Sequence, residues 1–124
     1  MNDAETIVRN FCAAFSRRNI EEILGYFAAE AVYHNIPIDP VQGTEAIRAV
    51  LEQFVAPAES VEFEVLHLAA RGNVVHTERV DHFRILGRDI ALPVAGVFEI
   101  DGGKITAWRD YFDMQQFMRQ SGMG

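Results

Sequence analysis

The stretch VVHTERVDHFRILGRDIALPVAGVFEI, residues 74–100, decides the fold of this 124-residue chain. LGRD at 86–89 is a turn signal, and the residues on both sides of it have a strand-like pattern in which side chains two residues apart share a face. Alternation with a period of two residues is typical of a strand that buries one face. The stretch therefore predicts a β-hairpin with strands over about 73–85 and 90–100.

Two further turn signals add a strand on each side of this hairpin. RGN at 71–73 predicts a preceding strand over about 61–70, and DGG at 101–103 predicts a following strand over about 104–113. Strands joined by such short turns form an antiparallel meander.

The first part of the chain has helical rather than strand-like spacing, in three segments. We expect the first helix to be capped by Asn2 with Glu5 as reciprocal partner, the second to be capped by Asn19, and the third to run from Gly43 until Pro57. The apolar positions that indicate these helices are Ile7, Val8, Phe11, Cys12 and Phe15; then Ile20, Ile23, Leu24 and Phe27; then Ile47, Val50, Leu51 and Phe54.

Helices followed by an antiparallel meander predict an α+β fold. We expect a curved antiparallel or mixed sheet that forms a cone, with the N-terminal helices packed over one face and a pocket at the open end. AAEAVYHNIP at 28–37 favours extended chain between the second and third helices. Because no linker, repeat or low-complexity segment interrupts the sequence, we expect residues 1–124 to form one domain.

Composition and charge argue against several classes of partner. The chain carries 11 Lys and Arg against 18 Asp and Glu, with no basic run, so nucleic acid is not expected as a partner. No apolar stretch approaches the roughly 20 residues of a membrane span, and no signal-peptide pattern is present, so we expect a cytoplasmic protein that does not bind membranes. Cys12 has no disulfide partner, and no Cys/His spacing resembles a metal site, so no metal is expected.

Charged residues share strand faces with large apolar ones. Alternation places Arg79 and Asp81 on one face of their strand, and it places Asp110 on the same face as two large aromatic residues in WRDYFD, 108–113. If these faces point into the cone, Arg79 lies between the two carboxylates, and its planar fork of five donors can bridge both. The alternative is a polar ladder on the outer face, and alternation alone does not decide between them.

A buried carboxylate, guanidinium and carboxylate would favour chemistry over stability. Removing each ion from water costs several kcal/mol, so such a set is a poor way to stabilise a fold. One positive charge shared by two carboxyls allows one to act as a protonated acid and the other as a base. Tyr33 and Asn35, two residues apart, offer a hydroxyl and an amide suited to holding one water, although Tyr33 alone would be an ordinary core tyrosine.

Three segments, VYHNIP, HTERVDHF and WRDYFD, resemble in this order the limonene-1,2-epoxide hydrolase family, whose members are small cofactor-free enzymes with a nuclear transport factor 2-like cone fold. In that family the Arg and Asp of ERVD and the first Asp of WRDYFD form an Asp-Arg-Asp triad, while the Tyr and Asn of the early strand help that last Asp to bind the attacking water. The resemblance implies these roles for Asp81, Arg79, Asp110, Tyr33 and Asn35.

The resemblance also implies the reaction, in which water is added in one step to a small-to-medium hydrophobic epoxide to give a vicinal diol. Asp110 would take a proton from the water, and protonated Asp81 would donate to the epoxide oxygen. A homodimer is expected chiefly from the likeness, with apolar surface offered by the outward-facing Val80, Val97 and Tyr111.

Apolar side chains near the carboxylates are candidates for the substrate-binding wall. They are Phe83, Leu92, Val94, Trp108 and Phe112 from the strands, with Phe15 and Phe54 from the helices. Each of them is equally compatible with plain core packing.

Two other functions are compatible with such a fold. A ketosteroid-isomerase-like enzyme would move a proton next to a carbonyl, but its carboxylate base would belong about where Asn35 stands, and an amide cannot serve. A non-catalytic module that binds hydrophobic ligands is the second alternative, since fold alone does not give function.

Overall fold

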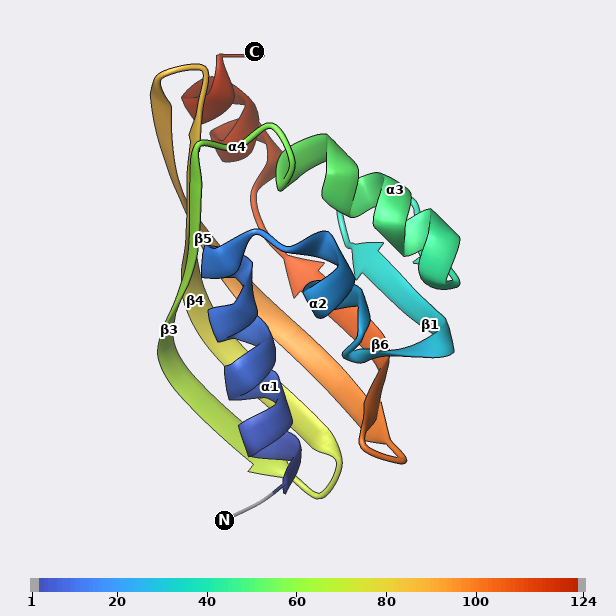
Figure 1. Cartoon of the computed structure of the whole chain (residues 1–124). Coiled ribbons are helices and arrows are strands. Elements are labelled where there is room, and N and C mark those ends of the chain that lie inside the picture. The colour runs from blue at the N-terminus through green and yellow to red at the C-terminus, as the bar shows by residue number, and fades with distance from the viewer. Residues whose placement is uncertain (1–2, 123–124) are drawn as a thin grey trace.

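The structure is a computed structural model that describes residues 3–122, in which one sheet curves around a group of helices (Figure 1). The elements in chain order are α1 (Asp3–Ala14), the 3-10 turn η1 (Phe15–Arg17), α2 (Ile20–Leu24), β1 (Phe27–Asn35), β2 (Val41–Gln42), α3 (Thr44–Phe54), β3 (Ser60–Arg71), β4 (Val74–Ile85), β5 (Arg88–Asp101), β6 (Lys104–Tyr111) and α4 (Met114–Ser121).

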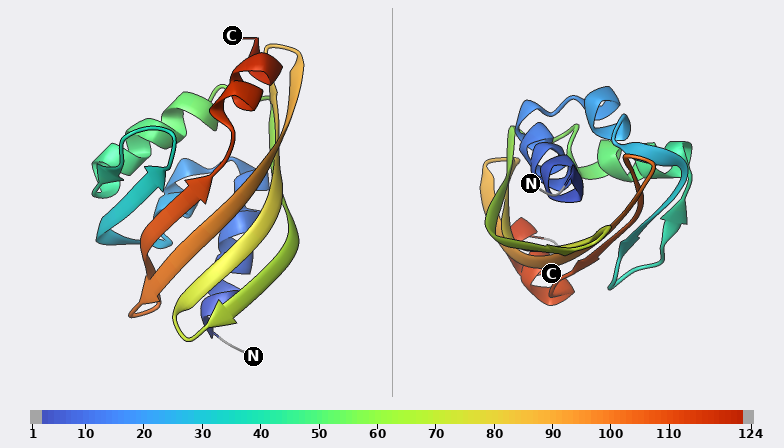
Figure 2. Two further views of the ribbon diagram at one scale, coloured as in Figure 1. Left: turned by 180° about the vertical axis from the view of Figure 1, so that it is seen from behind. Right: turned by 90° about the horizontal axis from the view of Figure 1, so that it is seen from below.

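The sheet has six strands in the order β2-β1-β6-β5-β4-β3. Strands β3 to β6 form the predicted antiparallel meander, and β1 pairs with β6 in parallel, so the sheet is mixed. Seen from one end, the sheet wraps around the helices without closing (Figure 2). The predicted α+β fold with a curved mixed sheet under N-terminal helices is therefore confirmed.

The concave face of the sheet is filled by an aromatic core centred on α1. Phe11 is completely buried there and packs edge-on against a set of rings from several elements: Phe15, Tyr26, Phe27, Phe98 and Trp108. Such edge-to-face contacts are favourable beyond the burial of their area. This core occupies the part of the cone that α1 covers and leaves the other end for a cavity.

Helix ends agree with the sequence in two places. The Asn19 side chain caps α2 by accepting from the backbone N–H of Glu22 at 3.1 Å, and α3 begins directly after Gly43. The expected cap at Asn2 lies outside the described residues. Within residues 3–122 no helix has the length and apolar character to cross a bilayer.

Several boundaries and elements differ from the sequence expectations. Phe27 begins β1 instead of continuing the second helix, because that helix already ends at Leu24 with Gly25 as its C-cap. The last strand ends at Tyr111, since Asp113 caps a helix that was not expected, α4, accepting from the N–H groups of two glutamines. The short strand β2 was not expected either.

Candidate active site

Strand register brings the predicted polar residues together on the concave face. Asp110 on β6 pairs with Asn35 on β1 and with Gly96 on β5, and Gly96 pairs in turn with Thr77 on β4. Because residues two apart share a face, Arg79 follows Thr77 on the inner side of β4. Exposure of Arg79 is 1% and that of Asp110 is 3%, so the alternative of an outer polar ladder is wrong.

Arg79 bridges the two carboxylates with its whole guanidinium. Its Nε and Nη2 donate to Asp81 Oδ1 and Oδ2, both at 2.9 Å. Its Nη2 and Nη1 donate to Asp110 Oδ2 and Oδ1 at 2.7 and 3.2 Å. Nη1 also donates to Thr77 Oγ1 at 3.1 Å, so each of the five N–H groups has an acceptor. The arrangement fixes both carboxylates relative to one cation.

Gly96 makes this close approach possible. A Cβ at this position would overlap Nη1 of Arg79 and would lie 2.7 Å from Asp110 Oδ1 and 2.9 Å from Thr77 Oγ1. Sequence reasoning did not single out Gly96 or Thr77. The available signal was a glycine inside a strand, on its inward row, which often marks a close approach of other groups.

Electrostatics make the two carboxyls suited to an acid and base pair. Burial raises the pKa of Asp81 to about 6, with Arg79 opposing the shift and the charge of Asp110 adding to it. Burial acts to lower the pKa of Arg79, but the two carboxylates outweigh it and hold that pKa well above its usual range. The guanidinium therefore stays charged, while Asp81 can hold a proton close to neutral pH.

Tyr33 and Asn35 reach the site from β1. Burial, followed by the charge of Asp110, raises the pKa of Tyr33 well above its usual range, while hydrogen bonding to Asn35 acts in the opposite direction. The Tyr33 hydroxyl therefore stays neutral. Together with the Asn35 amide, it offers donors and acceptors beside Asp110.

A cavity of about 730 Å³ opens onto these groups. Tyr33, Asn35, Asp81 and Asp110 are its inner polar lining. Five of the predicted wall residues also line it, namely Phe54, Phe83, Leu92, Val94 and Phe112. Further apolar lining residues that the sequence did not indicate include Ile38, Val50, Phe63, Ile85, Met114 and Phe117. The predicted constellation therefore lies at one end of a largely apolar chamber.

Two expected wall residues, Trp108 and Phe15, are corrected by the structure. Both have 0% exposure, and neither lines the cavity within the described residues. Phe15 is stacked on Phe63 with ring centroids 4.0 Å apart, and Trp108 is stacked on Tyr33 at 4.1 Å. They lie behind the lining because the inner face of the sheet is core where α1 covers it and cavity where α1 ends. Trp108 instead donates from Nε1 to Asp110 Oδ1 at 2.7 Å.

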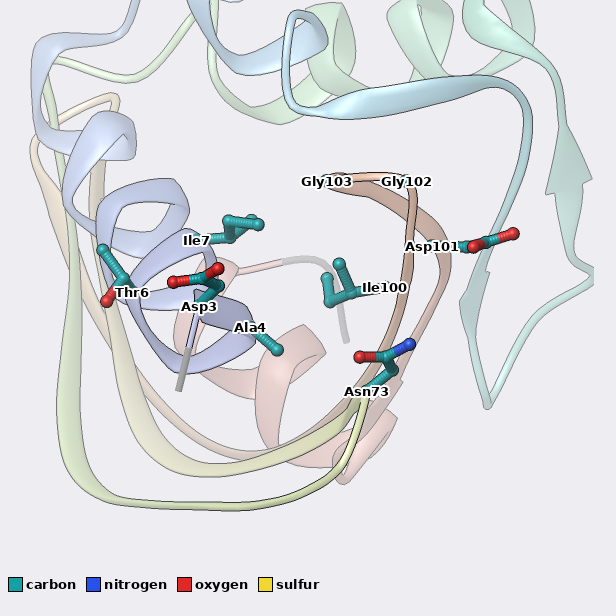
Figure 3. Close-up of a pocket in the computed structure, with 9 residues that line it drawn as sticks. All are labelled: Asp3, Ala4, Thr6, Ile7, Asn73, Ile100, Asp101, Gly102 and Gly103. Carbon is teal, nitrogen blue, oxygen red and sulfur yellow. The ribbon is translucent and has the colours of Figure 1, made fainter. Parts of the chain in front are cut away.

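A second cavity, of about 420 Å³, lies between the start of α1 and the turns after β3 and β5 (Figure 3). Asp3 and Asp101 both line this cavity, but in Figure 3 the Asp101 side chain points away from Asp3. Over the described part of the chain, no group of three or more His, Cys, Asp or Glu side chains is placed to hold a metal. This cavity shares no lining residue with the larger cavity beside Asp81 and Asp110.

The family model described as "Limonene-1,2-epoxide hydrolase catalytic domain" matches residues 2–122. The chain belongs to the limonene-1,2-epoxide hydrolase family. A curated protein similar to it is "Epoxide hydrolase EphG" of Mycobacterium tuberculosis, with 29% identity over 112 residues, which are 90% of this chain and 74% of that protein.

Several solved structures are similar to this chain over nearly its whole length. An epoxide hydrolase from M. tuberculosis, described as limonene-1,2-epoxide hydrolase-like, superposes with a TM-score of 0.83 at 27% identity, covering 97% of this chain and 92% of that one. A protein from Catenulispora acidiphila with a ketosteroid isomerase-like fold, solved with trimethylamine, gives 0.84 at 26% identity, covering 95% and 93%. A Shewanella putrefaciens protein described as a "putative SnoaL-like polyketide cyclase" gives 0.85 at 17% identity, covering 100% and 99%, and shows the fold alone.

Proposed function

We propose that the protein is an epoxide hydrolase that adds water in one step to a small-to-medium hydrophobic epoxide and gives a vicinal diol. The observation that carries the proposal is the buried set of Asp81, Arg79 and Asp110 at the polar end of an apolar cavity. Two carboxyls held by one guanidinium supply a base and an acid at fixed positions. The family to which the chain belongs supports the same reaction class.

The proposed reaction places one water between Asp110, Tyr33 and Asn35. Asp110 takes a proton from this water as its oxygen bonds to an epoxide carbon. The carbon–oxygen bond of the ring breaks, and its electron pair goes to the epoxide oxygen, which takes the proton held by Asp81. Asp81 is then ionised and Asp110 protonated, and exchange of protons with solvent restores the starting state.

Burial helps Asp81 to act as the acid in the proposed reaction, because it raises the pKa of this carboxyl. Since the pKa of Asp81 is raised to about 6, a useful fraction of the carboxyl is protonated near neutral pH, which an exposed aspartate would not provide. Arg79 keeps its charge throughout and interacts with whichever carboxyl is ionised at each stage. No covalent intermediate with the protein is required.

The cavity suits a hydrophobic substrate. Its volume of about 730 Å³ lies in the range typical of sites for small organic molecules. The aromatic rings of Phe54 and Phe83 meet edge-on at 5.6 Å on its wall, so an apolar body can be enclosed while the epoxide ring faces the carboxyls. We propose Phe54, Phe83, Leu92, Val94 and Phe112 as substrate-binding residues.

Incubation of the purified protein with a panel of cyclic and aryl epoxides tests the proposal. We expect diol formation that is lost in Asp110→Asn and in Asp81→Asn, since each substitution removes a proton acceptor or donor without changing shape. Asp113→Asn is the matched control, because Asp113 is exposed and an asparagine caps α4 equally well. Full activity in both site variants would contradict the proposed roles.

The same assays separate the alternative functions. Proton exchange into an enone without diol formation would indicate isomerase chemistry, and tight ligand binding without turnover would indicate a binding module. The amide of Asn35 stands where an isomerase base is expected, which favours hydrolysis.

We further propose a homodimer that forms through the convex face of the sheet. Tyr111 is 46% exposed there, and Val80 and Val97 lie on the same outer side without being fully buried. Sedimentation equilibrium of the protein and of Tyr111→Glu tests this, with dimer expected for the first and monomer for the second. A cytoplasmic location stays a prediction.

A further inference from the structure

The two carboxyls share one guanidinium, yet their hydrogen bonding is unequal. Within residues 3–122, Asp81 accepts hydrogen bonds from Arg79 only. Asp110 accepts from Arg79 and, in addition, from the indole Nε1 of Trp108 at 2.7 Å. Among the side-chain hydrogen bonds of the described residues, the indole bond therefore distinguishes the proposed base, Asp110, from the proposed acid, Asp81.

An indole N–H can only donate. A donor aimed at a carboxyl oxygen favours the ionised form over the protonated one. The bond is buried, and bonds to a charged acceptor are about twice as strong as neutral ones. A proton shared by the two carboxyls is therefore disfavoured on Asp110.

We infer that Trp108 is a positioning residue whose indole N–H keeps Asp110 ionised and directs the shared proton to Asp81. The effect on the rate rests on the proposed hydrolysis, which needs the proton on Asp81 and an ionised Asp110, and not the reverse. The raised pKa of Asp81, caused first by burial, agrees with a proton held there.

Packing fixes the direction of the N–H. The indole is stacked on Tyr33 with an interplanar angle of 6° and on Phe98 with an angle of 14°. Because Trp108 does not line the cavity, loss of its N–H leaves the substrate contacts in place. The expected effect is therefore on kcat rather than on KM.

The other titratable groups near Asp110 do not reproduce this effect. Arg79 forms ion pairs with both carboxyls and so does not favour one over the other, and Asp81 is the second carboxyl of the pair. From β1, Tyr33 has a pKa raised well above its usual range, chiefly by burial, and is neutral. From α1, burial raises the pKa of the Cys12 thiol to about 12, so it is neutral as well.

Trp108 is the single tryptophan of the chain, so an analogue incorporated in place of tryptophan changes this site alone. β-(3-Benzothienyl)alanine keeps the fused-ring shape and replaces the N–H with sulfur. We expect kcat to fall about 10- to 100-fold, the loss that one hydrogen bond to a charged group accounts for, with KM unchanged. Both limbs of the pH–rate profile should move to higher pH, because removing a donor favours the protonated carboxyl.

Two controls separate this effect from packing. 5-Fluorotryptophan keeps the N–H and should leave the pH profile in place. Phe98→Leu removes a ring stacked on the indole and should lower stability without moving either limb. Unchanged kcat and pH limbs in the benzothienyl protein, or equal losses with 5-fluorotryptophan, would overturn the inference.

Carboxyl ¹³C chemical shifts of the two aspartates locate the proton without any substrate. We expect Asp110 ionised and Asp81 partly protonated near neutral pH, with proton density moving to Asp110 in the benzothienyl protein. A shift pattern that the analogue does not alter would contradict the inference. If the pattern changes as expected but the protein turns over no epoxide, the proposed function fails and the proton placement stands.

Discussion

Substitution of Gly96 by alanine tests whether the triad depends on the missing side chain of β5. A Cβ at this position would lie 2.7 Å from Asp110 Oδ1, so reaching the 3.4 Å of ordinary contact requires that oxygen to move by about 0.7 Å. The bond from Arg79 Nη1 to this oxygen is already 3.2 Å long and would be lost. The substitution therefore disturbs a contact between buried charges on purely steric grounds.

The magnitude follows from that loss. A hydrogen bond between charged groups contributes about 1.5 to 3 kcal/mol, while replacing glycine by alanine inside a strand ordinarily stabilises by about 0.5 to 1 kcal/mol. We expect a net destabilisation of about 1.5 kcal/mol, or about 6 °C in Tm for a domain of this size. Displacement of the base by a fraction of an ångström should lower kcat/KM about 100-fold.

Urea unfolding and epoxide turnover measure both effects. Ala13→Ser is the control, since Ala13 is a small residue exposed on α1, away from the convex face of the sheet; its effect should stay within about 0.5 kcal/mol. A Gly96→Ala protein that is as stable and as active as the parent would refute the argument that this glycine makes room for the triad.

Three further outcomes are expected. The difference in unfolding free energy between Asp81→Asn and the parent should shift by about 3 kcal/mol in favour of the variant from pH 4 to pH 8, because a carboxyl whose pKa is raised to about 6 in the folded state contributes stability that is lost as pH rises through 6; urea unfolding of both proteins at the two pH values measures this. Arg79→Lys should lower kcat at least about 100-fold and destabilise by about 3 kcal/mol or more, since a lysine cannot bridge two carboxyls with a planar fork; retained activity would show that charge alone suffices. Tyr33→Phe should lower kcat about 10- to 100-fold with little change in Tm, because the ring stacking on Trp108 is kept while one contact to the water is lost; an unchanged kcat would remove Tyr33 from the mechanism.

Alternation along the strands predicted which charged residues share a face, but it could not predict which face is the inner one. Arg79 and Asp81 on β4 lie two residues apart, and this spacing holds whether the pair faces core or solvent. The direction is set by the helices that cover the concave side, and this is a property of the whole fold. Combining the motif of Asp110 with that of Arg79 and Asp81 was therefore more informative about the inner face than either strand read alone.

Trp108 and Phe15 show that residue spacing cannot predict whether an inward-facing side chain lines the cavity or lies in the core. Both are on inward-facing rows, as expected, but the row passes from tightly packed core to open cavity along its length. The position of that change depends on where α1 ends. An aromatic residue on an inner face is thus predictable, while its role as wall or core is not.

The C-terminal helix escaped prediction because its signals are polar and local. Asp113 as N-cap and Gly122 as C-cap frame it, yet the alternation of the preceding strand continues formally to residue 113. Only Phe117 and Met114 supply apolar lining from this helix, and no residue of it is fully buried. Its place beside the cavity comes from tertiary packing against β5, where Gln120 accepts from the N–H of Ala91 at 2.7 Å.

The central claim is that water held by Asp110 attacks the epoxide directly. A single turnover in ¹⁸O-labelled water, with protein in excess over epoxide, tests it most directly. We expect a diol that carries one ¹⁸O atom in this first turnover, with the mass of the protein unchanged. An unlabelled diol, together with ¹⁸O recovered in an aspartate carboxyl, would mean that the carboxylate itself attacks the epoxide and that direct attack by water is wrong.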